Sequence, residues 1–224
     1  MSWAKKINEF NSTLELGGVL PKGIDVMNPF QKKYTRSLSA TFYTKYYNDT
    51  NSRVMILGIN PGRFGAGLTG IPFTDPIKLE LICAIENTLS KKAELSADFI
   101  YAVIESFGVT KFYQQFYFSS VCPLGFTKNG KNLNYYDDKK LQKTVKPFIV
   151  SSMKTQIGFG MNTKNCYCLG EGKNYVFLNS LNDEYGFFQN IIPLPHPRYI
   201  MQYRRKKLND YVLMYTEKLN FAIR

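Results

Sequence analysis

The stretch Val54–Phe73, VMILGINPGRFGAGLTGIPF, decides the fold of this chain. It opens with the apolar run Val54–Leu57, which predicts a buried strand. The strand leads into a loop crowded with glycines, in which Asn60 is the polar side chain nearest the strand end. Because α/β proteins commonly build their sites where a buried strand ends in such a loop, we expect Asn60 to lie in a functional site.

The composition indicates a globular, basic protein. The 224 residues are 44% hydrophobic, enough to fill the core of one α/β domain, and no repeat or linker divides them. We therefore expect a single domain over residues 1–224. Lys and Arg number 29 against 17 Asp and Glu, which gives a formal net charge of +12. This charge attracts polyanions and favours nucleic acid as a partner, although a basic protein without such a partner stays an alternative.

Targeting, membrane and metal signals are weak in this sequence. No segment matches a signal peptide or the roughly 20 apolar residues of a membrane helix, so we expect an intracellular protein, cytoplasmic in a bacterium and nuclear in a eukaryote. The cysteines are too few for a disulfide scaffold and form no Cys-x-x-Cys motif. We expect buried structural thiols at Cys83, Cys122, Cys166 and Cys168, and no metal or cofactor.

Apolar runs and helical patterns alternate along the chain. Strands are predicted at Val54–Leu57, Phe116–Val121, Asn165–Leu169 and Phe188–Leu194. Helices are predicted at Trp3–Leu16, Ser37–Tyr47, Ile77–Leu89, Ser96–Phe107, Asn174–Leu181 and Arg204–Leu219. A further helix is predicted from Asp137 onward, with a kink or break at Pro147. Leu20–Phe30 and Thr127–Asn134 are expected to be irregular. The alternation predicts an α/β fold with a mostly parallel sheet of about four strands.

A nucleotide-binding motif in the glycine loop fits poorly. The segment Gly65–Gly70 has the letters G-x-G-x-x-G, but a dinucleotide site needs the first glycine at the strand end and the last one entering a helix. Here the strand ends near Leu57, and Gly70 is followed by Ile-Pro-Phe-Thr-Asp-Pro. A small-molecule nucleotide enzyme therefore ranks last among the interpretations.

The chain has one histidine, His196, held between Pro195 and Pro197 just after the fourth predicted strand. Two fixed φ angles restrain the backbone on either side of it. The carboxyl ends of parallel strands gather at one edge of a sheet, so residues after each strand should meet. Those expected at one crevice are Asn60, Ser120, Gly170 and His196. A purely structural hydrogen bond remains the alternative role for the imidazole.

A cationic segment with interleaved aromatic residues follows His196. Cations can pair with phosphates, and aromatic rings can stack on or wedge between bases. The other interpretation is the solvated start of a helix. The residues predicted to contact DNA are Arg198, Tyr199, Tyr203, Arg204, Arg205, Lys206 and Lys207.

Four motifs together resemble the uracil-DNA glycosylase superfamily, specifically its single-strand-selective monofunctional branch. They are Gly58–Gly65, Thr69–Phe73, Cys122–Leu124 and His196–Arg198. The resemblance implies a three-layer α/β/α fold around a four-stranded parallel sheet. It also implies a monofunctional glycosylase that excises a damaged base from DNA without a cofactor. We expect such an enzyme to act as a monomer on a base flipped out of the DNA.

The resemblance also implies roles for individual residues. Asn60 matches the family residue that positions the attacking water, and His196 matches the one that hydrogen-bonds the departing base. Phe73 matches the aromatic ring on which the base stacks, and Arg198–Tyr203 falls in the loop that penetrates the duplex. The expected base pocket consists of Ile59, Gly62, Phe64, Phe73 and Ser120.

One position departs from the family pattern. Two residues before Cys-Pro-Leu, where the family reads uracil with an Asn, this chain has Ser120. A side-chain amide presents a donor and an acceptor together, whereas one hydroxyl cannot make the same paired contact. We therefore hypothesise a broader or altered base choice, with uracil and the deaminated purines hypoxanthine and xanthine as the candidate substrates. The same departure is compatible with a non-catalytic nucleic-acid-binding protein that retains the fold.

Overall fold

A four-stranded parallel sheet forms the centre of the computed structural model, which describes residues 1–222. Its strands lie in the order β3-β2-β6-β7, and each neighbouring pair is parallel. Their bounds are Arg53–Gly58 for β2, Phe116–Ser120 for β3, Met161–Leu169 for β6 and Asn190–Leu194 for β7. The predicted mostly parallel sheet of four strands is confirmed.

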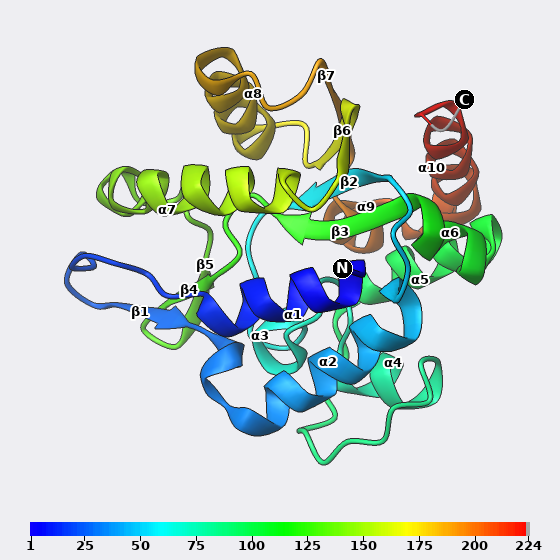
Figure 1. The fold of residues 1–224 in the computed structure, drawn as a ribbon, viewed down its shortest axis with the longest axis horizontal. Helices are drawn as coiled ribbons and strands as arrows, with labels where there is room; N and C mark the ends of the chain where they lie inside the picture. Colours follow the sequence, from blue (N-terminus) through cyan, green and yellow to red (C-terminus); the bar gives the residue numbers. More distant parts are fainter. Residues whose placement is uncertain (223–224) are drawn as a thin grey trace.

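Helices cover both faces of this sheet, which makes the three-layer α/β/α arrangement that the sequence predicts (Figure 1). On one face, Tyr117 of β3 lies 5.5 Å from the Trp3 ring and its hydroxyl donates to Gln156. These contacts place α1 (Trp3–Thr13) and α7 (Lys139–Ile157) on that face, with α8 (Lys173–Tyr185) beside α7. On the other face, Phe116 packs against Phe107 at 5.3 Å, and the Tyr167 hydroxyl donates to the Lys218 carbonyl. There lie α5 (Leu95–Phe107) and α10 (Leu208–Ala222), with α9 (Pro197–Tyr203) packed against α5.

A fully buried arginine fixes the start of β2. The Arg53 guanidinium pairs with Asp49 at 2.7 Å and donates through Nε to the Tyr113 carbonyl at 2.7 Å. It also lies 5.0 Å from the Trp3 ring and 4.9 Å from the Tyr47 ring. The charge is therefore fully compensated, and it joins the first strand of the sheet to α1, to α2 (Lys33–Tyr47) and to α6 (Val109–Gln115).

A second, antiparallel sheet was not predicted. It has the order β1-β4-β5, with β1 at Ile24–Met27, β4 at Gly125–Lys128 and β5 at Lys131–Leu133. The prediction of irregular structure over Leu20–Phe30 and Thr127–Asn134 is therefore wrong. Strands of three or four residues are too short to show an alternating pattern. The dipeptide Asn129-Gly130 between β4 and β5 is nevertheless a strong hairpin signal, because a two-residue hairpin turn requires positive φ angles at both positions. The two residues adopt φ angles of 51° and 70°.

The helix after the glycine loop is shorter than predicted. As expected, it begins at an Asp cap, since Asp75 Oδ1 accepts hydrogen bonds from the backbone amides of Ile77 and Lys78. It ends at Leu81, so α4 spans Pro76–Leu81 rather than reaching Leu89. Leu81 and Ile82, predicted to be buried, are 76% and 52% exposed. The helix cannot continue because the chain turns through a left-handed conformation at Ala84, φ 52°.

The remaining differences concern short helices and one proline. The helices α3 (Ala66–Thr69), α6 and α9 were not predicted, because a helix of one or two turns shows little periodicity. The last helix begins at Leu208 rather than Arg204, after a 3₁₀ turn, η2, at Arg205–Lys207; another, η1, lies at Pro29–Gln31. Of the kink or break predicted at Pro147, the break does not occur, since α7 runs on to Ile157. Its fully buried apolar face there outweighs the roughly 3 kcal/mol that an interior proline costs.

The four cysteines are buried and free, as predicted. Within residues 1–222, the helices are too short or too polar to cross a bilayer.

Candidate active site

The carboxyl ends of three parallel strands open into a cleft with a volume of about 180 Å³. Asn60 follows β2, Ser120 ends β3 and His196 follows β7, and all three line this cleft. The predicted gathering of these side chains at one sheet edge therefore occurs. Gly170 follows β6 and lies next to His196, because a Cβ on Gly170 would be 3.9 Å from His196 Cδ2. Gly170 does not itself line the cleft.

The Asn60 side chain is fixed in one orientation by the small antiparallel sheet. Its Oδ1 accepts a hydrogen bond from the Tyr135 backbone amide at 3.0 Å, and its Nδ2 donates to the Leu133 carbonyl at 3.3 Å. These backbone contacts distinguish oxygen from nitrogen, so the amide has one allowed orientation. An amide oxygen accepts two hydrogen bonds, which leaves one lone pair of Oδ1 for a molecule in the cleft.

His196 lies in the cleft as a neutral hydrogen-bond donor. It caps α9, because its Nδ1 accepts from the Arg198 backbone amide at 3.1 Å. An accepting Nδ1 carries no proton, so the neutral ring carries its proton on Nε2. Burial and the nearby Arg198 charge lower the pKa of His196 to about 4. The Tyr215 hydroxyl, which donates to the Pro195 carbonyl, fixes the strand end that precedes the ring.

Phe73 forms an aromatic wall of the cleft in a strained backbone conformation. Its φ is 54°, a value that non-glycine residues rarely adopt. The ring lies against Gly58, where a Cβ would come within 2.9 Å of Phe73 Cζ, and 5.3 Å from the Phe118 ring. One side of the Phe73 ring is thus packed against Gly58 and Phe118, while the half-buried ring still lines the cleft. Ile59 and Gly62 also line the cleft, as expected.

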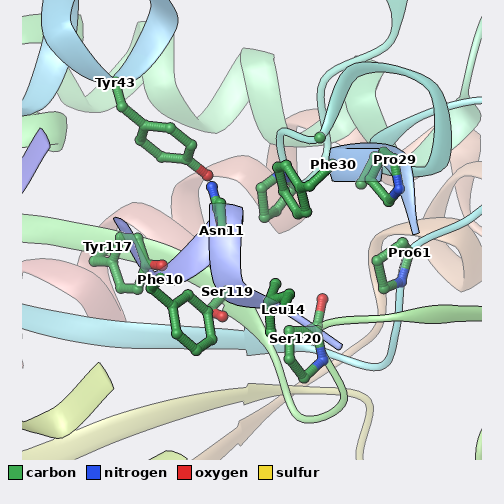
Figure 2. Close-up of a pocket in the computed structure, with 14 residues that line it drawn as sticks. Phe10, Asn11, Leu14, Pro29, Phe30, Tyr43, Pro61, Tyr117, Ser119 and Ser120 are labelled. Atoms are coloured by element: carbon green, nitrogen blue, oxygen red, sulfur yellow. The ribbon is translucent and has the colours of Figure 1, made fainter. Parts of the chain in front are cut away.

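Ser120 lies between the cleft and a smaller inner cavity of about 30 Å³, together with Pro61, Ala66 and Pro72, which also line both. Figure 2 shows this inner cavity between the end of β3 and α1, with Phe10, Leu14 and Pro61 around it. The cavity has room for one or two water-sized groups and none for a ring. The short Ser120 side chain therefore leaves space behind the cleft wall.

Several predicted residues lie outside the cleft. The Phe64 ring is beside Arg63 and Lys92, whose charges lie 4.5 and 5.0 Å from its centroid, and it does not line the cleft. The expected loop at Arg198–Tyr203 is wrong in conformation, because these residues belong to the helix α9; that this segment penetrates the duplex stays a prediction. Arg198 lines the cleft, and the others are exposed residues that follow it in the chain, on α9 and up to the end of η2: Tyr199, Tyr203, Arg204, Arg205, Lys206 and Lys207.

Sequence reasoning missed four polar residues of the cleft. They are Glu94, Ser96, Asn132 and Asn134. The two asparagines come from the β4–β5 hairpin, which the Asn129-Gly130 turn signal could have revealed. Glu94 and Ser96 lie at the start of α5, where the sequence carries no strand-end signal. Among residues 1–222, no three His, Cys, Asp or Glu side chains are grouped to hold a metal ion.

The fold and the cleft define a class of hydrolase. The sheet edge presents a fixed amide, a neutral imidazole donor and an aromatic wall, an arrangement suited to a flat heterocycle attached to a sugar. Comparison with known proteins identifies the family within this class: residues 44–220 match the model of the Uracil DNA glycosylase superfamily, and the chain belongs to that superfamily.

A solved structure places the chain within the superfamily. The wild-type SMUG2 of Pedobacter heparinus is 46% identical, with a TM-score of 0.96 over 99% of this chain and 98% of that one. No curated protein matches the chain significantly. The predicted superfamily, its SMUG-like branch and the α/β/α fold are thereby confirmed. The protein is a monofunctional DNA glycosylase, an enzyme that hydrolyses N-glycosyl bonds.

Proposed function

We propose that this glycosylase excises uracil, hypoxanthine and xanthine from DNA, with Asn60 and His196 as its catalytic residues. The observation that carries the proposal is the neutral imidazole of His196, which offers Nε2–H in the same cleft as the fixed Asn60 amide. In this proposal the base is flipped out of the DNA and stacks on Phe73.

The proposed chemistry follows from the charges that develop during bond cleavage. Breaking an N-glycosidic bond leaves negative charge on the base and positive charge on the sugar. A donor aimed at a base oxygen stabilises the charge that exists only in the transition state, and His196 supplies it without itself carrying a charge. Asn60 holds the attacking water through the free lone pair of Oδ1.

Base choice depends on Ser120 in this proposal. Its hydroxyl can donate or accept but cannot form the paired contact that an amide makes with a uracil edge. Discrimination against bases with a different edge is therefore weaker. The space behind Ser120 supports this, because the wall that meets the base edge is not filled.

We also propose that residues 1–224 act as one domain, because residues from Ile59 to Arg198 line a single cleft, and that the protein acts as a monomer. The exposed cations of η2, together with Arg204, bind phosphates beside the cleft and hold the DNA while the base leaves the stack. This binding offsets the few kcal/mol that base flipping costs.

A panel of oligonucleotides tests the proposal. Single- and double-stranded DNA containing uracil, hypoxanthine or xanthine is incubated with the enzyme, and abasic sites are detected by alkaline cleavage. We expect product from all three bases. Removal of uracil alone contradicts the proposed base choice, and absence of product from every substrate contradicts the assigned site.

A further inference from the structure

Glu94 is the carboxylate that lines the cleft among the described residues, and no predicted role includes it. Its Oε2 is buried and has no hydrogen-bond partner within residues 1–222. Leaving a buried polar atom without a partner costs about 1–3 kcal/mol, so proteins rarely tolerate one without a function.

The backbone holds Glu94 firmly in place. Its amide donates to Asp75 Oδ2 at 2.9 Å, while the other oxygen of Asp75 caps α4. Glu94 also directly precedes α5, a helix buried against the sheet. The carboxylate is therefore presented to the cleft by two helix starts rather than by a free loop.

The glycine loop after β2 leaves room for this carboxylate. A Cβ on Gly65 would lie 1.9 Å from Glu94 Oε2, and a Cβ on Gly62 would lie 3.3 Å from Oε1. Gly65, the first glycine of the segment that resembles a nucleotide-binding motif, thus leaves room for the Glu94 side chain, as does Gly62. Glu94 thus lies against the loop that bears Asn60, at Gly62 and Gly65. It lies on the side of the cleft where the attacking water is proposed.

The charged groups that act on the carboxylate are Asp75 and Arg198, and the titratable His196 lines the same cleft. Burial, and then the Asp75 charge, raise the pKa of Glu94 to about 7, while Arg198 opposes the shift. His196 is neutral and adds no charge. Near neutral pH, Glu94 can therefore both accept and release a proton.

We propose that Glu94 is a further catalytic residue, the general base that takes a proton from the water held by Asn60. As the water oxygen bonds to C1′ of the sugar, one of its protons passes to the Glu94 carboxylate. The electrons of the N-glycosidic bond leave with the base, which His196 stabilises as an anion and which then takes a proton from solvent. Glu94 afterwards releases its proton to solvent. This inference rests on the proposed role of Asn60, because an amide can orient water but cannot deprotonate it.

The decisive experiment compares Glu94→Gln with wild type in single-turnover excision of uracil and hypoxanthine, from about pH 5 to pH 9. We expect the wild-type rate to rise with pH through an apparent pKa near 7 and then level off. Glu94→Gln should be slower by about 100-fold at the plateau and should lose this rise, with both bases affected equally. DNA affinity, measured by fluorescence anisotropy, should be unchanged.

Controls separate this inference from the proposed function. Glu86→Gln changes an exposed acid of the segment between α4 and α5, which also contains Glu94, and this variant should behave as wild type. Glu94→Asp keeps the acid and should recover part of the lost rate, which a folding defect in Glu94→Gln would not explain. If Asn60→Ala is inactive but Glu94→Gln retains its rate and pH profile, only the role of Glu94 fails. If Asn60→Ala remains active, the proposed site itself fails.

A loss confined to hypoxanthine would also overturn the inference. In that case Glu94 would act as a proton donor to the purine rather than as a base toward water.

Discussion

Phe73 packs against Gly58 so closely that a single added carbon on Gly58 would come within 2.9 Å of the Phe73 ring. Gly58 ends the central strand β2, and Phe73 lies beyond the glycine loop with a positive φ of 54°. The loop between them carries Asn60. The contact therefore joins the two ends of the stretch that forms most of one side of the cleft.

Substituting Gly58 with Ala should displace the aromatic wall. The ring cannot move away freely because Phe118 lies 5.3 Å behind it. We expect excision to fall on the order of 100-fold, since a displacement of about 1 Å in a positioning group can cost that much. Single-turnover kinetics measure the loss, and Gly17→Ala, where no atom lies within 4 Å, is the control. Equal rates in the two variants would show that Phe73 does not position the base.

Substituting Asn60 with Ala should abolish excision and leave DNA binding nearly intact. The amide makes its two shortest hydrogen bonds with backbone groups of Leu133 and Tyr135, and the exposed cations that we propose to bind phosphate lie elsewhere, from α9 to η2. Excision assays and fluorescence anisotropy on the same oligonucleotide measure the two properties. Surviving turnover would mean that another group positions the water.

The central sheet and the meeting of Asn60, Ser120 and His196 could be predicted because each depends on local pattern. A buried parallel strand is a short apolar run, and strand ends of such a sheet meet at one edge whatever the details of the helices. The tautomer of His196 could not be predicted, because it depends on the Arg198 amide that the helix α9 brings to Nδ1.

Glu94 and the β4–β5 hairpin show where sequence reasoning stops. Glu94 follows an irregular connection after α4, and only the tertiary contact with Asp75 brings its carboxylate to the glycine loop. The hairpin orients Asn60 through backbone groups of Leu133 and Tyr135, which no side-chain pattern reveals. Residues that act through backbone contacts leave little trace in the sequence.

His196 should make the stability of the protein depend on acidity. Its pKa is lowered from 6.5 to about 4 in the folded state, so the unfolded chain binds more protons between these values. The His196 contribution to stability should therefore become unfavourable as the pH decreases from about 6.5 toward 4, and it should vanish at neutral pH; the raised pKa of Glu94 acts in the opposite direction, so the effect of His196 is read from the difference between wild type and a His196 variant. Thermal melts across this range should show a smaller decrease for His196→Asn. Parallel curves for the two proteins would contradict the burial of a neutral imidazole.

Removing two charges from η2 should weaken DNA binding without changing the chemistry. Lys206 and Lys207 are exposed on η2, which follows α9 and its cleft residue Arg198 in the chain. If both contact phosphates, the double substitution to Gln should reduce the slope of log affinity against log salt by about 2. Lys164→Gln is the control, because this exposed lysine lies early in β6, toward the opposite edge of the sheet. A slope that changes equally in both variants would locate the DNA elsewhere.

Substituting Ser120 with Asn should narrow base choice toward uracil. The amide would extend the wall between the cleft and the 30 Å³ inner cavity, and would present a donor and an acceptor to the base edge. A well-formed paired contact discriminates between bases by about 1–3 kcal/mol, so the ratio of uracil to hypoxanthine excision should rise at least about tenfold. Ser120→Ala removes the hydroxyl without filling the space and should leave that ratio low. If Ser120→Asn leaves the ratio unchanged as well, base choice is set by another part of the cleft.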